Sequence, residues 1–144
     1  MKVDIYSKEI KLDKKEREKI KEIVKKIIIE EGYSEAEIEI NIQNDEELKE
    51  INKKFLKKNY YTDVITFNEI IKNKINGKIF ISIDRVKENS KKRKNNLKEE
   101  FFRVIIHSVL HLCNYNDYNK SEKIKIRIKE NYYLKKFNIS ENGI

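Results

Sequence analysis

Apolar side chains in this chain follow two different periods, and each period predicts one kind of element. Ile38, Ile40 and Ile42 alternate strictly with polar residues, which predicts a strand with one buried face. Val3 and Ile5 alternate in the same way near the N-terminus, so a first strand is expected there. Two more strands are expected over residues 62–67 and 78–84, with residues 68–77 as the loop between them.

Helices are expected between these strands because apolar residues there recur at the helical period. Asp13 with Glu16 and Asn44 with Glu47 are pairs typical of a helix N-terminus, and Gly32 is a typical stop. The expected helices cover residues 14–31, 44–56, 85–94, 96–112 and 121–134. Together, the elements predict a single α+β domain over residues 1–144, with a roughly four-stranded mixed sheet and about five helices.

Composition agrees with one domain and indicates where the protein works. A length of 144 residues is enough for a domain that buries most of its apolar surface without disulfide bonds. Cys113 is the only cysteine, so no disulfide can form within the chain and a reducing compartment is expected. The N-terminus carries no apolar signal segment and no apolar run reaches membrane-spanning length. We therefore expect a cytoplasmic protein without a membrane partner.

The formal net charge of +8 favours a polyanionic partner such as RNA, because bound phosphates release counterions and the field steers the encounter. The chain is also rich in Lys, Ile and Asn and contains no Pro. A drift of the coding sequence toward A and T would produce the same bias. Charge alone therefore leaves both explanations open.

The two histidines of the chain, His107 and His111, lie four residues apart on the most apolar helix. This spacing places both imidazoles on one helix face. Two imidazoles in an apolar core are costly unless they share a partner, and a metal ion is the commonest such partner. The alternative is a pair of core histidines satisfied by ordinary hydrogen bonds.

The segment after this helix supplies a third donor. A metzincin-type site has two histidines on a helix, a residue that turns the chain back, and then a third ligand. Asn114 tolerates the left-handed conformation that such a turn requires, and Asp117 follows at the third position. These three ligands leave a position open for water, as in a catalytic zinc site. Zinc is the expected ion, although the anionic oxygen of Asp117 could favour another divalent metal.

The neighbouring residues narrow the chemistry. Ser108 stands where a zinc protease of this layout carries its general-base glutamate, so peptide hydrolysis is disfavoured. Two histidines and a carboxylate also bind iron in non-haem oxygenases, but the helical spacing and the lack of an all-β pattern argue against that class. Cys113 lies two residues past His111 and faces another direction, which favours a packed thiol over a ligand.

Three segments of the chain carry motifs that occur together in one known family. Residues 107–117 are His-Ser-Val-Leu-His-Leu-Cys-Asn-Tyr-Asn-Asp, residues 62–67 are Thr-Asp-Val-Ile-Thr-Phe, and residues 77–82 are Gly-Lys-Ile-Phe-Ile-Ser. These resemble the motifs of the YbeY family of bacterial metal-dependent endoribonucleases, whose signature is His-Gly-x-Leu-His-Leu-x-Gly-Tyr-Asp-His. Its strands carry Thr-Asp-Val-Leu-Ser-Phe and Gly-Asp-Ile-x-Ile-Ser. The resemblance covers nearly the whole chain.

The chain departs from the family pattern at functional positions. Asp117 replaces the usual third histidine, and Ser108 and Asn114 replace two glycines. Lys78 replaces the Asp of the second strand motif. Leu56 stands where the family places an arginine that is a candidate for binding phosphate. A nearby lysine would supply only a point charge in its place.

The resemblance implies a metal-dependent, single-strand-specific endoribonuclease that matures the 3′ end of 16S ribosomal RNA and takes part in ribosome quality control. Its implied partners are ribosomal RNA and the small ribosomal subunit, with ribosomal proteins and an assembly GTPase as further ones. A monomer or a weak homodimer is expected. Arg103, Ser82 and Asp63 are expected beside the metal as catalytic residues. The candidates for holding the RNA backbone and bases are Lys53, Lys54, Lys57, Lys58, Arg85, Lys87, residues 91–94, Tyr60, Tyr61, Tyr115 and Tyr118.

Two other functions stay open at this point. The same domain could bind ribosomal RNA as an assembly factor with a structural metal and little catalytic activity, which Leu56 favours. It could also be a metal hydrolase that acts on something other than RNA. Binding driven by phosphates weakens as salt is added, so salt dependence separates RNA from other substrates.

Overall fold

A computed structural model describes residues 1–58 and 62–139. Within them, one four-stranded sheet has the order β1-β2-β4-β3. Strands β1, β2 and β4 run parallel to one another, and β3 runs antiparallel to β4, so the expected mixed α+β architecture is confirmed. The strands are β1 (Lys2–Ser7), β2 (Glu35–Gln43), β3 (Val64–Ile71) and β4 (Lys74–Ser82).

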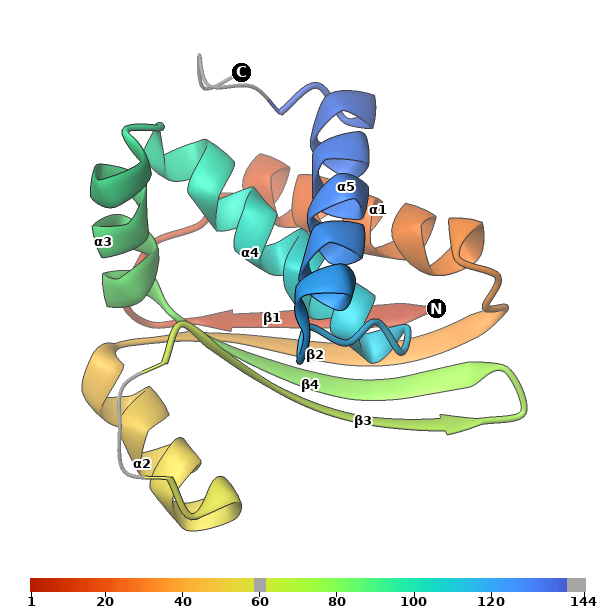
Figure 1. Ribbon diagram of the computed structural model, residues 1–144, viewed down its shortest axis with the longest axis horizontal. Coiled ribbons are helices and arrows are strands. Elements are labelled where there is room, and N and C mark those ends of the chain that lie inside the picture. Colours follow the sequence, from red (N-terminus) through yellow and green to blue (C-terminus); the bar gives the residue numbers. More distant parts are fainter. Residues whose placement is uncertain (59–61, 140–144) are drawn as a thin grey trace.

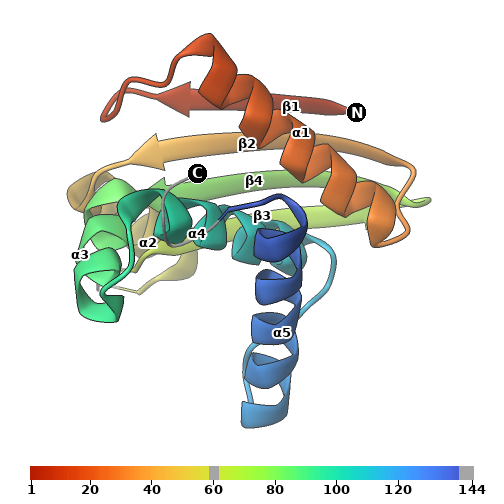
Figure 2. The same cartoon turned by 90° about the horizontal axis from the view of Figure 1, so that it is seen from above.

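Five helices accompany the sheet in the described part of the chain. They are α1 (Lys14–Glu30), α2 (Asp45–Leu56), α3 (Ile83–Arg93), α4 (Leu97–Leu112) and α5 (Lys120–Lys136). Helices α1, α4 and α5 lie on one side of the sheet and α2 lies on the other (Figure 1). Helix α1 packs over β1 and β2, α4 packs over β4 and β3, and α5 packs against α4 (Figure 2).

The core lies between the sheet and α1 and α4. Ile38, Ile40 and Ile42 are buried on the helix-covered face, as their alternation predicts. Gly77 of β4 lets α4 come close, because a Cβ atom there would lie 2.7 Å from a methyl carbon of Leu112. The last turn of α4 is therefore held tightly against the sheet, next to the residues that matter for the site.

The loop expected over residues 68–77 is wrong. Strands β3 and β4 pair from Val64 and Ile81 to Ile71 and Lys74, and only two residues connect them. Lys72 and Asn73 both have positive φ, at 49° and 66°, which matches the tight hairpin turns that follow the twist of paired strands. Most of the residues of the expected loop therefore lie inside β3 and β4.

Helix ends agree with the sequence where a capping pair is present. Asp13 with Glu16 and Asn44 with Glu47 form the expected capping boxes. Strand β4 ends at Ser82 rather than at residue 84, because the Ser82 hydroxyl caps α3, which begins at Ile83. Helix α5 is longer than expected at both ends. In the described residues, no helix combines the length and apolar character needed to cross a membrane.

Candidate metal centre

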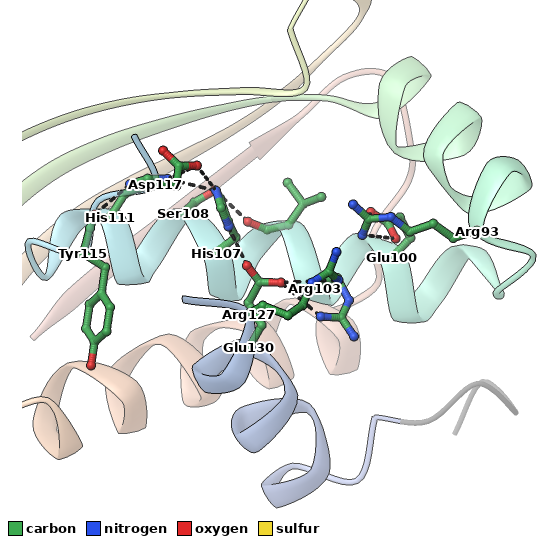
Figure 3. A network of polar contacts seen from close by, with 11 residues as sticks. Arg93, Glu100, Arg103, His107, Ser108, His111, Tyr115, Asp117, Arg127 and Glu130 are labelled. Atoms are coloured by element: carbon green, nitrogen blue, oxygen red, sulfur yellow. Dashed lines mark hydrogen bonds and ion pairs between the residues drawn. The ribbon is translucent and has the colours of Figure 1, made fainter. Parts of the chain in front are cut away.

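Helix α4 keeps one stripe out of the core. Between Glu99 and Leu112, only Arg103, His107 and His111 are not fully buried. Their spacing of four residues aligns them along one face (Figure 3). The two imidazoles approach edge to face with ring centroids 4.5 Å apart, and their Nε2 atoms are 2.9 Å apart.

The turn after α4 brings the third donor to the histidines. Asn114 is left-handed with φ 70°, as the sequence predicts. Its N–H donates to the carbonyl of His111, and the Tyr115 N–H donates to the carbonyl of Leu110, a pairing typical of helix C-termini. The reversed chain then places Asp117 Oδ2 at 3.4 Å from the Nε2 atoms of both histidines.

Hydrogen bonds fix which nitrogen of each ring carries the proton. His107 Nδ1 lies 2.6 Å from Glu130 Oε2, and His111 Nδ1 lies 2.9 Å from the carbonyl oxygen of Tyr115. A carboxylate and a carbonyl only accept, so both Nδ1 atoms donate, and each ring in its neutral form presents an Nε2 lone pair. Two Nε2 atoms and the Asp117 carboxylate therefore face one point, an arrangement that needs a cation or a shared proton between them.

This donor set fits a metal ion. One ligand atom from each of His107, His111 and Asp117 lies within 4.8 Å of the others. Two imidazole nitrogens and one carboxylate oxygen suit zinc or a similar divalent ion, and three protein ligands leave room for water. Cys113 is a packed thiol, as expected, because it is buried and burial raises its pKa to about 12.

Glu130 of α5 is the functional residue that sequence reasoning missed. Its Oε1 accepts from Arg103 at 3.0 Å while its Oε2 accepts from His107 (Figure 3). Burial alone would raise the pKa of the Glu130 carboxyl, but His107 and Arg103 outweigh burial and hold that pKa below its ordinary value. Burial likewise lowers the pKa of His107, yet the hydrogen bond and charge of Glu130 raise it overall.

A carboxylate behind a histidine ligand orients the ring and strengthens it as a donor. The sequence carries little signal for Glu130. The buried residues of α5 are Ile126, Glu130, Tyr133 and Leu134, but an equally apolar row of the same helix, Ile124, Ile128 and Tyr132, is exposed. Only the packing of α5 on α4 decides which row is buried.

Two of the three predicted catalytic residues lie at the site. Asp63 and Arg103 line a cavity of about 240 Å³ together with His107, Asp117 and Glu130. Ser82 does not line it. Its side chain is fully buried, its hydroxyl donates to Asp45 Oδ1 at 2.6 Å, and it accepts from the Arg85 N–H at 3.2 Å. These contacts are those of a helix cap.

Most of the expected RNA-binding residues lie away from this cavity. Of the basic candidates, Arg93 lines it, whereas Arg85 forms an ion pair with Asp45 at 3.1 Å. The Tyr115 hydroxyl donates to Glu31 Oε1 at 2.7 Å, so its ring is committed to packing and hydrogen bonding. Tyr118 is 85% exposed. Tyr60 and Tyr61 lie outside the described residues.

The fold and the donor set define a class of protein: a small α+β domain with a candidate metal site formed by one helix and the turn after it, beside a cavity. A family model described as endoribonuclease YbeY matches residues 2–138. The chain belongs to this family, which supports an endoribonuclease role, that is, a hydrolase acting on RNA.

Similar proteins agree with this assignment. An endoribonuclease YbeY of Cytophaga hutchinsonii is 39% identical over 83% of this chain and 85% of its own length. One from Flavobacterium psychrophilum is 37% identical over 83% and 85%. The solution structure of TM1509 from Thermotoga maritima covers 94% of this chain and 88% of its own, with 23% identity and a TM-score of 0.65, so it supports the fold.

Proposed function

We propose that this protein cuts single-stranded RNA with a divalent metal held by His107, His111 and Asp117. Zinc is the expected ion. Its substrate is the 3′ region of 16S ribosomal RNA, and it acts in the cytoplasm during ribosome maturation and quality control. The observation that carries the proposal is the convergence of two histidine nitrogens and one carboxylate oxygen on one point beside a cavity.

The metal point is the position that the Nε2 atoms of His107 and His111 and the carboxylate of Asp117 face. The residues around it have different roles. A bound metal lowers the pKa of a water molecule or polarises a phosphoryl oxygen. Glu130 and the Tyr115 carbonyl hold the protons of the two histidines on Nδ1, which aims each Nε2 lone pair at the metal point. Asp63 lines the cavity, and its carboxylate has no ion pair within residues 1–58 and 62–139. It therefore takes the role of proton acceptor for the attacking water.

Ribosomal RNA and the small ribosomal subunit are the partners that this function requires, with ribosomal proteins and an assembly GTPase as further ones. The net charge of +8 supports a polyanionic partner. One observation favours the assembly-factor alternative. Leu56 ends α2 with a side chain 41% exposed, so α2 presents no cation at the position where the family carries arginine.

The test measures metal content and RNA cleavage on the same preparations. Purified protein should hold one equivalent of metal and cut a single-stranded oligonucleotide of the 16S 3′ region but not its duplex. His111→Ala should lose both the metal and the cleavage. Asp63→Asn should keep the metal and lose cleavage, which separates a catalytic site from a structural one.

Three outcomes would count against the proposal. Wild-type protein that binds metal but cuts no RNA would favour the assembly factor. Normal processing of ribosomal RNA in cells that carry only His111→Ala would do the same. A metal-free protein with an intact fold would mean that His107 and His111 are core histidines satisfied by ordinary hydrogen bonds.

A further inference from the structure

The cavity beside the metal point has a basic wall built from three helices. Arg93 of α3, Arg103 of α4, and Lys123 and Arg127 of α5 all line it. Figure 3 shows Arg103 and Arg127 together beside Glu130, and Arg93 of α3 next to Glu100. These four cations differ in what their charged groups already bind.

Two of the cations are committed to buried carboxylates. Arg93 Nη1 lies 3.2 Å from Glu100 Oε1, whose side chain is only 1% exposed. Arg103 Nη1 lies 3.0 Å from Glu130 Oε1, whose side chain is 6% exposed. A substrate that took either arginine would leave a buried carboxylate without its partner, which is costly. Both arginines therefore hold the wall in place.

The other two cations have donors to spare. The oxygens of Glu130 accept from His107 and Arg103, so Arg127 Nη1 stays 4.0 Å from Oε1, beyond hydrogen-bond distance. Its side chain is 49% exposed. Lys123 lies one helical turn earlier on the same face, is exposed, and makes no ion pair with any described residue.

We propose that Lys123 and Arg127 bind backbone phosphates of the RNA strand beside the bond that is cut, and so guide the strand along α5 into the metal site. This inference rests on the proposed function. Guanidinium groups present a planar fork that matches phosphate oxygens, and lysine adds a point charge. The carboxylates of Asp63 and Asp117 line the same cavity and would repel phosphate, which Lys123 and Arg127 offset.

The experiment measures the affinity of a non-cleavable single-stranded RNA oligonucleotide over a series of salt concentrations. The variant Lys123→Ala/Arg127→Ala should weaken binding at least about tenfold at low salt. The slope of log affinity against log salt should become shallower by about 1.4, or about 0.7 for each lost phosphate contact. Metal content and kcat should stay unchanged while KM rises. The single variant Arg127→Lys should keep most of the wild-type slope of log affinity against log salt, because the charge is kept.

The matched control is Lys98→Ala/Lys135→Ala, which removes the same charge from exposed positions outside the cavity. Lys135 lies eight residues beyond Arg127, or about 12 Å along α5. A control that weakens binding as much as the test variant would make the effect one of net charge and overturn the inference.

An unchanged salt slope in Lys123→Ala/Arg127→Ala would also overturn the inference. Cleavage by the wild type would then leave the proposed function standing. Loss of metal from that variant would contradict the assigned role as well. Wild-type protein that binds no RNA would overturn both proposals together.

Discussion

Two glutamates of this protein, Glu130 buried and Glu31 half-buried, are each held by several hydrogen-bond donors, with different consequences. The side chain of Glu130 is 6% exposed and that of Glu31 is 9% exposed, and each accepts from several donors. Glu130 accepts from His107 and Arg103. The other nitrogen of His107, Nε2, faces Asp117 and His111. Glu130 therefore acts on the metal point through the His107 ring. Burial and hydrogen bonding alone therefore do not distinguish a functional carboxylate from a structural one.

The side-chain hydrogen bonds of Glu31 reach none of the three proposed metal ligands. Glu31 follows α1 and accepts from the hydroxyls of Tyr115 and Tyr133 and from Lys129 Nζ at 3.2 Å. Tyr115 links the two halves of the comparison, because its hydroxyl binds Glu31 while its backbone carbonyl accepts from His111. His107 is thus oriented by a side chain, and His111 by a backbone atom that the Glu31 cluster helps to place.

The largest expected effect comes from Glu130→Gln. An amide cannot accept from both His107 and Arg103 as a carboxylate does, so the proton of His107 is no longer fixed on Nδ1. Metal affinity should fall by about 10–100-fold, the usual cost of losing such a partner. Competition with a chromophoric chelator measures it. Wild-type affinity in this variant would show that Glu130 is merely a packed acid.

Glu31→Gln should act mainly on stability. It weakens charge-assisted hydrogen bonds from Tyr115, Tyr133 and Lys129, so the free energy of unfolding should fall by about 1.5–3 kcal/mol. Metal affinity of the folded protein should change far less than in Glu130→Gln. Urea unfolding and the same chelator assay check both halves. A loss of metal affinity equal to that of Glu130→Gln would erase the distinction.

The pH dependence of stability sharpens the same comparison. Burial would raise the pKa of Glu31, but the hydrogen bonds from Tyr133, Tyr115 and Lys129 outweigh it and hold that pKa below the ordinary 4.5. A carboxyl whose pKa is lower in the folded state stabilises the protein above its unfolded pKa. That contribution disappears as the pH falls through the folded-state pKa.

The stability difference between wild type and Glu31→Gln should therefore be constant near neutral pH and shrink below about pH 4.5. Urea unfolding of both proteins from neutral pH to about pH 3 measures it. A difference that grows on acidification would have the wrong sign for a stabilised carboxylate.

Local physics explains which parts could be foreseen from the sequence. The helix that carries His107 and His111, its capping residue and the left-handed Asn114 depend on neighbours within a few positions. The sequence therefore predicts these features and the approach of Asp117. The capping boxes of α1 and α2 were predictable for the same reason.

Long-range pairing explains what could not be foreseen. By its residue type, Glu130 is no different from Glu122 eight positions earlier, and only the packing of α5 on α4 buries the first of them. The cap formed by Ser82 depends on Asp45, which is distant in sequence. The hairpin of β3 and β4 was missed because its tight turn, Lys72 and Asn73, contains no glycine.

The smallest expected effect comes from Tyr115→Phe, which removes one hydroxyl and leaves the backbone carbonyl. Stability should fall by about 0.5–1.5 kcal/mol, since Glu31 keeps Tyr133 and Lys129 as partners. Metal affinity should stay at the wild-type level, because the carbonyl of residue 115 still accepts from His111 Nδ1. Urea unfolding and chelator competition on one preparation test both. A marked loss of metal affinity would mean that the hydroxyl, through Glu31, positions His111 as strongly as Glu130 positions His107.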